Sequence, residues 1–215
     1  MTAAVVFDMD GLLVDSEDSW TIAETTLFTR YDKPFGLDEK RALLGNAGDA
    51  IARLLERLLD QPGRGRELGD ELLALVLDVA RRDGVAPRPG AVALVEDLRG
   101  RVPLAVASNS PRSLVDLALS SAGLLEGWGT VVCGADVEAL KPAPDIYLEA
   151  CRRLGVRPGE AVALEDSPTG VAAARAAGLF VIGVPSVPGV VLEADLVADS
   201  LADRPVRAAL GLAPK

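Results

Sequence analysis

Five short apolar runs along the chain have the length and composition typical of buried strands. They are rich in Val, Ile and Ala and lie at residues 5–7, 104–107, 131–133, 161–164 and 180–184. Continuous apolar runs that alternate with helical patterns are typical of parallel strands covered on both faces. The pattern therefore predicts an α/β protein with a doubly wound, Rossmann-like parallel sheet.

Helix signals follow the later runs. Ser110-Pro111 and Ser167-Pro168 each place a serine where it can cap a helix before a proline in the first turn. Glycines that can end the helices follow at 123, 155 and 178. Because ligands of such sheets bind at the carboxyl ends of the strands, the short loops there are expected to carry the function.

One long segment breaks this alternation. Residues 16–84 have only the periodicity of helices, with apolar positions at Ile51, Leu54, Leu55, Leu58, Leu59, Leu68, Leu72, Val76 and Val79. The Gly- and Pro-rich stretch 84–90 marks a linker after it. We therefore expect two parts, an α/β core at 1–15 and 85–215 and an inserted helical domain at 16–84.

Composition supports a globular protein of 215 residues, because its 49% apolar content and mean hydropathy of +0.26 allow a sizeable core. Two cysteines, Cys133 and Cys151, are too few for a disulfide framework, and no secretory leader is evident. The longest apolar region, 179–192, is interrupted by prolines and a glycine, so no membrane span is predicted. A cytoplasmic protein, monomeric by default, is expected.

Charge and the lack of histidine exclude several function classes. Lys and Arg number 22 against 32 Asp and Glu, which gives a net charge of −10 with no basic cluster, so nucleic acid and anionic membranes are not expected partners. The chain contains no histidine, which excludes Ser-His-Asp and Cys-His catalysis and histidine-ligated zinc. Carboxylates, hydroxyls, amides, lysine or a metal must supply any chemistry.

Acidic residues follow two of the predicted strands. Asp8 and Asp10 come directly after the first run, and Glu165 and Asp166 come after the fourth. An Asp-Gly pair such as Asp10-Gly11 is by itself typical of a turn. Several carboxylates at one sheet edge, however, repel each other unless a hard cation neutralises them, and Mg²⁺ prefers such oxygen ligands. The sequence therefore predicts a Mg²⁺ site at this edge.

Hydrogen-bond donors and a cation complete the expected site. Ser108 and Asn109 end the second run, and Lys141 lies in a Lys-Pro-Ala-Pro segment beyond the third. A lone lysine is usually a solvated surface residue, but beside a metal these three groups suit an anionic tetrahedral ligand such as phosphate.

A competing motif is less informative. Cys151 and Arg157 have the C-x5-R spacing of cysteine-dependent phosphatases. Tyr147, Cys151 and Leu154 follow helical spacing, however, and no histidine is present to activate the thiol. We expect Cys151 to be a buried core thiol.

Four motifs in order resemble those of haloacid dehalogenase-superfamily phosphatases with a small helical cap, the group that includes β-phosphoglucomutase-like hydrolases. The matching segments are, in order, DMDGLLVDSE, ASNS, KPAPDIY and ALEDSPTGVAAARAAG. The resemblance spans nearly the whole chain, and the segment 16–84 is its weakest part.

The resemblance implies a role for each candidate residue. Asp8 is the nucleophile that forms an aspartyl-phosphate, and Asp10 is the acid and base that protonates the leaving alcohol and activates water. Asp8, the main-chain carbonyl of Asp10 and Asp166 hold Mg²⁺, with Glu165 nearby or ligating. The phosphoryl group is bound by three further residues, Ser108, Asn109 and Lys141. Asp15 is expected to stabilise the loop.

These roles imply a Mg²⁺-dependent phosphatase acting on a small phosphorylated metabolite of sugar or polyol type. A sugar-phosphate mutase is the first alternative, but Trp20 stands near the position of the cap histidine of such mutases, and the loop 45–49 supplies no arginine for a second phosphate. A receiver-like phosphoacceptor is the second alternative, which leaves the insertion 16–84 unexplained. A non-catalytic protein with this fold is the third.

Overall fold

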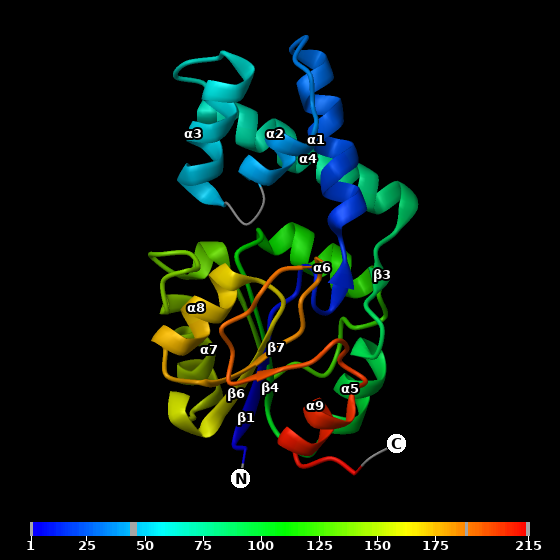
Figure 1. Cartoon of the computed structure of the whole chain (residues 1–215), viewed down its shortest axis with the longest axis vertical. Helices are drawn as coiled ribbons and strands as arrows, with labels where there is room; N and C mark the ends of the chain where they lie inside the picture. The colour runs from blue at the N-terminus through cyan, green and yellow to red at the C-terminus, as the bar shows by residue number, and fades with distance from the viewer. Residues whose placement is uncertain (1, 44–46, 188, 214–215) are drawn as a thin grey trace. The chain divides into compact units, whose positions relative to one another are not determined.

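The computed structural model describes residues 2–43, 47–187 and 189–213. The chain forms two compact units, one of Met1–Asp15 with Ala86–Lys215 and one of Ser16–Val85. Figure 1 shows the first as a sheet flanked by helices and the second as a group of helices. Part of the loop 45–49, whose sequence supplies no arginine for a second phosphate, lies outside the described residues.

A six-stranded sheet forms the centre of the α/β unit. Its strands are β1 (Ala4–Phe7), β4 (Leu104–Ser108), β5 (Thr130–Cys133), β6 (Ala161–Glu165), β7 (Phe180–Gly183) and β8 (Leu196–Val197). They are all parallel, in the order β5-β4-β1-β6-β7-β8. The predicted doubly wound sheet is confirmed; the short strand β8 was not predicted.

Helices cover both faces of this sheet. The helices of the unit are α5 (Ala91–Leu98), α6 (Arg112–Ser121), α7 (Asp145–Leu154), α8 (Pro168–Ala176) and α9 (Arg204–Ala209), with 3₁₀ turns at Gly134–Asp136 and Pro158–Glu160. α7 and α8 pack on one face through small side chains of alternate strand positions, among them Ala4, Ala105, Ala107, Ala161 and Ala163. α5 and α9 lie on the other side (Figure 1).

A two-stranded ribbon lies where the chain passes from one unit to the other. β2 (Val14–Asp15) pairs antiparallel with β3 (Ala86–Pro87). The backbone N–H of Arg88 donates to the carbonyl of Leu13 at 2.9 Å, and the Arg88 guanidinium lies 3.4 Å from the Asp15 carboxylate. The stretch 84–90 predicted as a linker thus contains a strand, because its partner is supplied by distant residues.

The second unit is helical, as its periodicity predicted. It consists of α1 (Glu17–Arg30), α2 (Leu37–Leu43), α3 (Gly48–Leu59) and α4 (Gly65–Asp83). α4 packs against α1 and α3, with Leu55, Leu59, Leu68, Leu72 and Val76 buried. Lys40 joins α2 to α1, since its Nζ lies 2.8 Å from the Glu24 carboxylate and 3.0 Å from that of Glu17.

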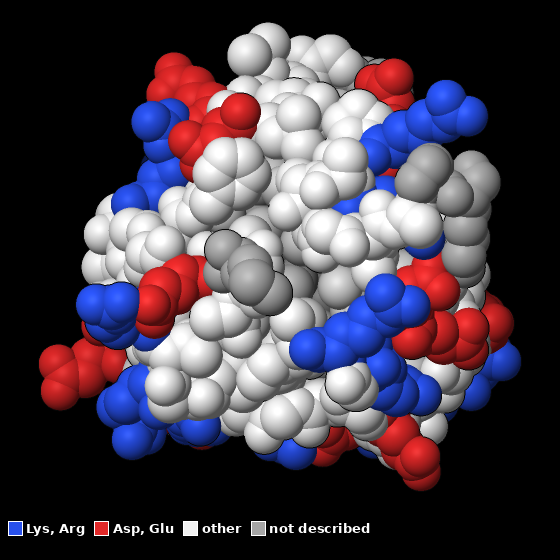
Figure 2. Space-filling view, turned by 90° about the horizontal axis from the view of Figure 1, so that it is seen from below, with Lys and Arg blue, Asp and Glu red and all other residues white. Residues whose placement is uncertain are grey.

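Charged side chains of both signs are mixed on the surface that carries the chain termini. Figure 2 shows acidic and basic groups interspersed around a neutral centre on this face. Among the described residues, no helix is both long and apolar enough to span a bilayer.

Candidate active site

The carboxyl ends of the central strands bring together polar side chains that were predicted from the sequence. Asp8 and Asp10 follow β1, Ser108 is the last residue of β4, and Glu165 is the last residue of β6. β1 pairs in parallel with β4 on one side and with β6 on the other. These side chains therefore start from one edge of the sheet, where ligands of such folds bind.

Asp8 is nearly buried at this edge, with 7% of its surface exposed. Its Oδ1 accepts a hydrogen bond from Lys141 Nζ at 2.6 Å, whereas its Oδ2 is buried and accepts none from the described residues. Burial raises the pKa of the Asp8 carboxyl well above its ordinary value; the Lys141 ammonium opposes this rise, and the Glu165 carboxylate adds to it. A buried carboxylate oxygen without a partner is costly, so this atom indicates a place for a ligand.

Lys141 supplies the positive charge of the site. Its Nζ lies 2.6 Å from Asp8 Oδ1 and 2.6 Å from Glu165 Oε1. Burial alone would lower the pKa of this ammonium, but the Asp8 and Glu165 carboxylates raise it above its ordinary value. Lys141 is therefore charged, with both carboxylates as its partners.

Asn109 fixes the main chain of Lys141. The Lys141 N–H donates to Asn109 Oδ1 at 3.0 Å, and Asn109 Nδ2 donates to the Lys141 carbonyl at 3.4 Å. Both ends of the Asn109 amide are thus engaged by the backbone that carries the lysine. Asn109 therefore orients Lys141 by holding its main chain rather than its ammonium group.

Glu165 is completely buried, and both of its oxygens accept hydrogen bonds. Oε1 accepts from Lys141 Nζ and from the Tyr147 hydroxyl, each at 2.6 Å. Oε2 accepts from the Asp166 N–H at 3.1 Å and from the Ser167 hydroxyl at 3.3 Å. A charged carboxylate without solvent is stabilised by such a full set of donors.

Tyr147 is a site residue for which the sequence indicated no role beyond a position in a helical spacing. It lies in α7, fully buried, with Lys141 Nζ 5.1 Å from its ring centroid. Burial raises the pKa of its phenol well above the ordinary value, and the Glu165 carboxylate raises it further, so the hydroxyl is a neutral donor. The spacing of Tyr147, Cys151 and Leu154 predicted the helix, but nothing in the local sequence indicated that Glu165 is the partner of the hydroxyl.

Asp166 completes an acidic cluster. One carboxylate oxygen from each of Asp8, Glu165 and Asp166 lies within 4.8 Å of the others. Burial raises the pKa of the Asp166 carboxyl to about 7, with Glu165 as the next cause, whereas the Ser186 hydroxyl, which donates to it at 2.6 Å, lowers it. Gly11, at φ +80°, passes so close that a Cβ there would overlap Asp166. Such a set of oxygens suits Mg²⁺.

Two hydroxyls from the β4 end contact Asp10. Asp10 Oδ2 accepts from Ser110 Oγ at 2.8 Å and from Ser108 Oγ at 3.3 Å, and the Ser110 N–H donates to Ser108 Oγ at 3.1 Å. The prediction that Ser110 caps a helix is wrong. Pro111 occupies the N-cap of α6 without a side-chain bond, since the Ser110 hydroxyl is directed to Asp10 instead.

Residues 2–178 match the sequence model of the haloacid dehalogenase-like hydrolases. The chain belongs to this family. It is 32% identical, over 186 residues, to fructose-1-phosphate phosphatase YqaB of Escherichia coli (strain K12), covering 85% of this chain and 96% of that protein. It is 34% identical, over 187 residues, to a probable pseudouridine-5'-phosphatase of Drosophila melanogaster, covering 84% of this chain and 80% of that one.

A solved structure of CbbY from Rhodobacter sphaeroides in complex with phosphate has the same fold. The two superpose with a TM-score of 0.83 at 29% identity, covering 94% of this chain and 96% of CbbY. The predicted membership of the haloacid dehalogenase group and the predicted fold are thereby confirmed. The prediction of an enzyme, a phosphatase of this family, is confirmed as a class.

Two acidic or nucleophilic candidates lie apart from this haloacid dehalogenase-like site. Asp15 is exposed and pairs with Arg88 on the ribbon. Cys151 lies in α7 with 1% of its surface exposed, and burial raises the pKa of its thiol to about 11. The C-x5-R spacing is therefore incidental, as predicted, because a buried protonated thiol is not a nucleophile.

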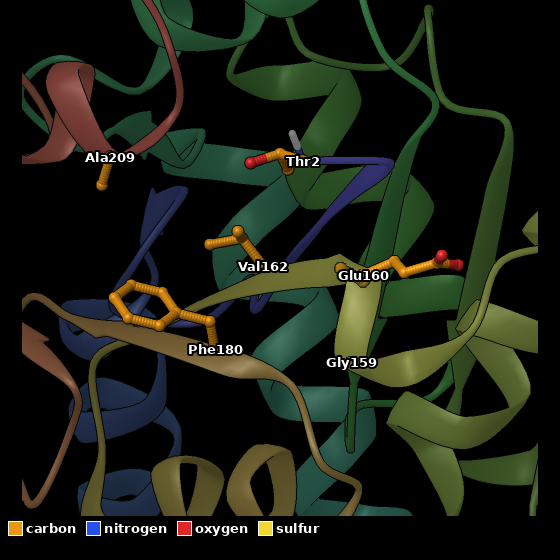
Figure 3. A pocket seen from close by; sticks show the side chains of 7 residues that line it. Thr2, Gly159, Glu160, Val162, Phe180 and Ala209 are labelled. Atoms are coloured by element: carbon orange, nitrogen blue, oxygen red, sulfur yellow. The ribbon is translucent and has the colours of Figure 1, made fainter.

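A hollow of about 480 Å³ lies at the opposite, amino-terminal edge of the sheet. Figure 3 shows the side chains of Val162, Phe180 and Ala209 turned toward it and that of Glu160 turned away. Its other lining residues are Thr2, Gly159 and Ala161. The candidate chemistry of this hydrolase is concentrated at the other edge.

Proposed function

We propose that this chain hydrolyses the phosphate monoester of a small sugar or polyol, with Mg²⁺, through an aspartyl-phosphate on Asp8. The observation that carries the proposal is Oδ2 of Asp8, which is buried and has no hydrogen-bond partner among the residues that the structure describes. Asp8 belongs to the three-carboxylate cluster and lies beside the ammonium of Lys141. A nucleophile that must meet an anionic phosphoryl group needs a compensating positive charge at this place.

The residues present fit a magnesium ion. Asp8 and Asp166 would hold it with carboxylate oxygens, and the main-chain carbonyl of Asp10 would add a third ligand. Glu165, whose two oxygens already accept hydrogen bonds, is proposed to hold Lys141 rather than to bind the metal directly. When bound, Mg²⁺ would offset the negative charge of the phosphoryl oxygens.

In the first proposed step, a carboxylate oxygen of Asp8 attacks phosphorus, and the bond from phosphorus to the ester oxygen breaks. Asp10 donates a proton to that leaving oxygen, so the product departs as an alcohol. Lys141, charged and close to Asp8, and the Ser108 hydroxyl bind the phosphoryl oxygens. Asn109 contributes by fixing the backbone of Lys141.

In the second proposed step, the Asp10 carboxylate accepts a proton from water while the water oxygen attacks phosphorus. The bond between Asp8 and phosphorus breaks, which releases inorganic phosphate and restores the Asp8 carboxylate. The helical unit is proposed to be a cap that admits substrate and excludes bulk water.

The substrate class is supported by the relatives. The similar Escherichia coli protein is named a fructose-1-phosphate phosphatase, and another relative, 34% identical over 191 residues, is named a (DL)-glycerol-3-phosphatase. Hydrolysis is favoured over mutase activity because the chain has no histidine at all. The cytoplasmic location and monomeric state stay predictions.

The test is phosphate release from hexose, pentose and polyol monophosphates, with Mg²⁺ and with EDTA. We expect Mg²⁺-dependent turnover that Asp8→Asn abolishes, and a weakened Mg²⁺ response in Asp166→Ala. Asp15→Asn is the matched control, because Asp15 is exposed and outside the cluster; it should retain activity.

Other outcomes would contradict the proposal in distinct ways. Retained turnover in Asp8→Asn would remove the nucleophile assignment. Interconversion of sugar phosphates without phosphate release would indicate a mutase. Incorporation of one phosphate per chain without turnover would indicate a phosphoacceptor.

A further inference from the structure

Ser110 lies outside the roles assigned so far, yet its side chain is hydrogen-bonded to the proposed acid, Asp10. Its hydroxyl donates to Asp10 Oδ2 at 2.8 Å, and the residue is 8% exposed. Its position after β4 is suited to capping α6, but the side chain makes no cap bond there. A nearly buried hydroxyl that contacts an acid a hundred residues away in the sequence needs an explanation in the site.

The two serines at the β4 end form a connected unit with Asp10. The Ser110 N–H donates to Ser108 Oγ at 3.1 Å, and Ser108 Oγ in turn donates to the same Asp10 oxygen at 3.3 Å. Asp10 Oδ2 therefore accepts from two hydroxyls, and the shorter bond comes from Ser110. The orientation of Ser108 also depends on the Ser110 backbone.

This arrangement restricts the Asp10 carboxyl group. The single proton of the Ser108 hydroxyl is needed by a phosphoryl oxygen once substrate is bound, whereas the Ser110 hydroxyl has no other assigned role and keeps its bond to Oδ2. The Ser110 bond therefore limits rotation of the carboxyl group. Proton transfer to a leaving group requires both a defined proton position and a defined direction.

We propose that Ser110 is a positioning residue for proton transfer by Asp10: its hydrogen bond to Oδ2 holds the carboxyl group in the direction from which it gives its proton to the leaving oxygen. This inference rests on the proposed function, in which Asp10 is the general acid. Ser110 itself transfers no proton and binds no phosphate.

The test compares two esters with different needs for an acid. The leaving group of a sugar or polyol phosphate is an alkoxide unless its oxygen is protonated, whereas the leaving group of p-nitrophenyl phosphate is a stable phenolate. The measured quantity is kcat/KM, which reports the steps up to departure of the leaving group and does not contain the second, shared step. We expect Ser110→Ala to lower kcat/KM for the alkyl ester by roughly tenfold, which is a part of the usual contribution of acid–base catalysis. For the aryl ester we expect kcat/KM to fall by less than about threefold.

Three variants make the comparison decisive. Ser110→Thr keeps a hydroxyl and should restore most of the alkyl-ester activity. Ser113→Ala removes an exposed serine on α6 and should affect neither ester. In Asp10→Asn, the addition of Ser110→Ala should cause no further loss on the alkyl ester, because the acid on which it acts is gone.

The outcomes separate this inference from the proposed function. If Asp10→Asn lowers kcat/KM for the alkyl and the aryl ester equally, the general-acid role of Asp10 fails. If Asp10→Asn is selective for the alkyl ester but Ser110→Ala is not, the positioning role fails while the proposed function stands. A changed inhibition constant for inorganic phosphate in Ser110→Ala would also overturn it, because it would show that Ser110 binds the phosphoryl group.

Discussion

Replacing Tyr147 with phenylalanine removes one oxygen atom from the interior of the α/β unit and leaves the ring in place. The lost hydroxyl donates to Glu165 Oε1 at 2.6 Å, and both residues have no exposed surface. Water therefore does not reach the carboxylate in the folded protein to replace the hydrogen bond. The change isolates the contribution of one donor to a buried charge.

The expected loss of stability is about 1.5–3 kcal/mol, the usual contribution of a hydrogen bond to a charged group. A loss of about 3–5 kcal/mol would be expected if the carboxylate were left without an ionic partner. Glu165 keeps Lys141 Nζ at 2.6 Å on the same oxygen, so the lower range applies. Lys141 also keeps its place near the ring, whose centroid is 5.1 Å away.

Urea unfolding followed by tryptophan fluorescence measures this loss. The chain has two tryptophans, one in each unit, so a Trp20→Phe background leaves Trp128 as a reporter of the α/β unit. Trp128 contacts Phe7 of β1 edge to face, with ring centroids 5.7 Å apart. EDTA is included so that metal binding does not stabilise the folded state.

Tyr31 provides the matched control. Its hydroxyl also donates to a glutamate, Glu71, at 3.0 Å, but that side chain is 28% exposed and lies in the helical unit. Tyr31→Phe should lower the stability reported by Trp128 by no more than about 0.5 kcal/mol. A loss of less than about 0.5 kcal/mol in Tyr147→Phe would refute the argument, since Glu165 could then not depend on this donor in a dehydrated site.

Further predictions concern the same network and the buried thiol. Lys141→Met removes the cation shared by two buried carboxylates and should cost about 3–5 kcal/mol in the same unfolding assay; a cost below about 1 kcal/mol would contradict their burial. Gly170→Ala would place a Cβ in overlap with the Glu165 carboxylate and should cost about 1–3 kcal/mol, whereas Gly159→Ala, whose Cβ meets no atom closer than 4.0 Å, should be well tolerated. With a thiol pKa of about 11, Cys151 should react with an alkylating reagent at pH 8 only on unfolding, and Cys151→Ser should remain an active phosphatase; loss of turnover with an intact fold would revive a catalytic cysteine.

The strands and the acids that follow them could be predicted from sequence because both depend on short-range patterns. A short apolar run that is buried on both faces forms few structures other than a strand of a parallel sheet. β1, β4 and β6 are such runs, and polar residues stand at or just after their carboxyl ends. A parallel sheet then places those ends at one edge. This is why Asp8, Ser108 and Glu165 could be grouped before their distances were known.

Identical local signals nevertheless had different outcomes. Ser167-Pro168 caps α8, with the Ser167 hydroxyl accepting from the Gly170 N–H at 3.1 Å, as predicted. Ser110-Pro111 has the same local pattern, but its hydroxyl bonds to Asp10. The difference arises because the chain after β1, the strand beside β4, places the Asp10 side chain within hydrogen-bond distance of Ser110, and the hydroxyl donates to Asp10 Oδ2 instead of turning to the helix end.

What the sequence by itself determined is the five longer strands of the sheet, the helical nature of the insertion, the acidic edge and the family motifs, since these follow from residue type and spacing along the chain. Only the tertiary structure decided which donor serves which carboxylate: Tyr147 and Lys141 for Glu165, and Ser110 for Asp10. It also paired the ribbon strands β2 and β3 across the inserted helices. The physical reason is that a buried hydrogen bond depends on the distance between two groups that are far apart in the chain. The local pattern of apolar and polar residues does not specify that distance.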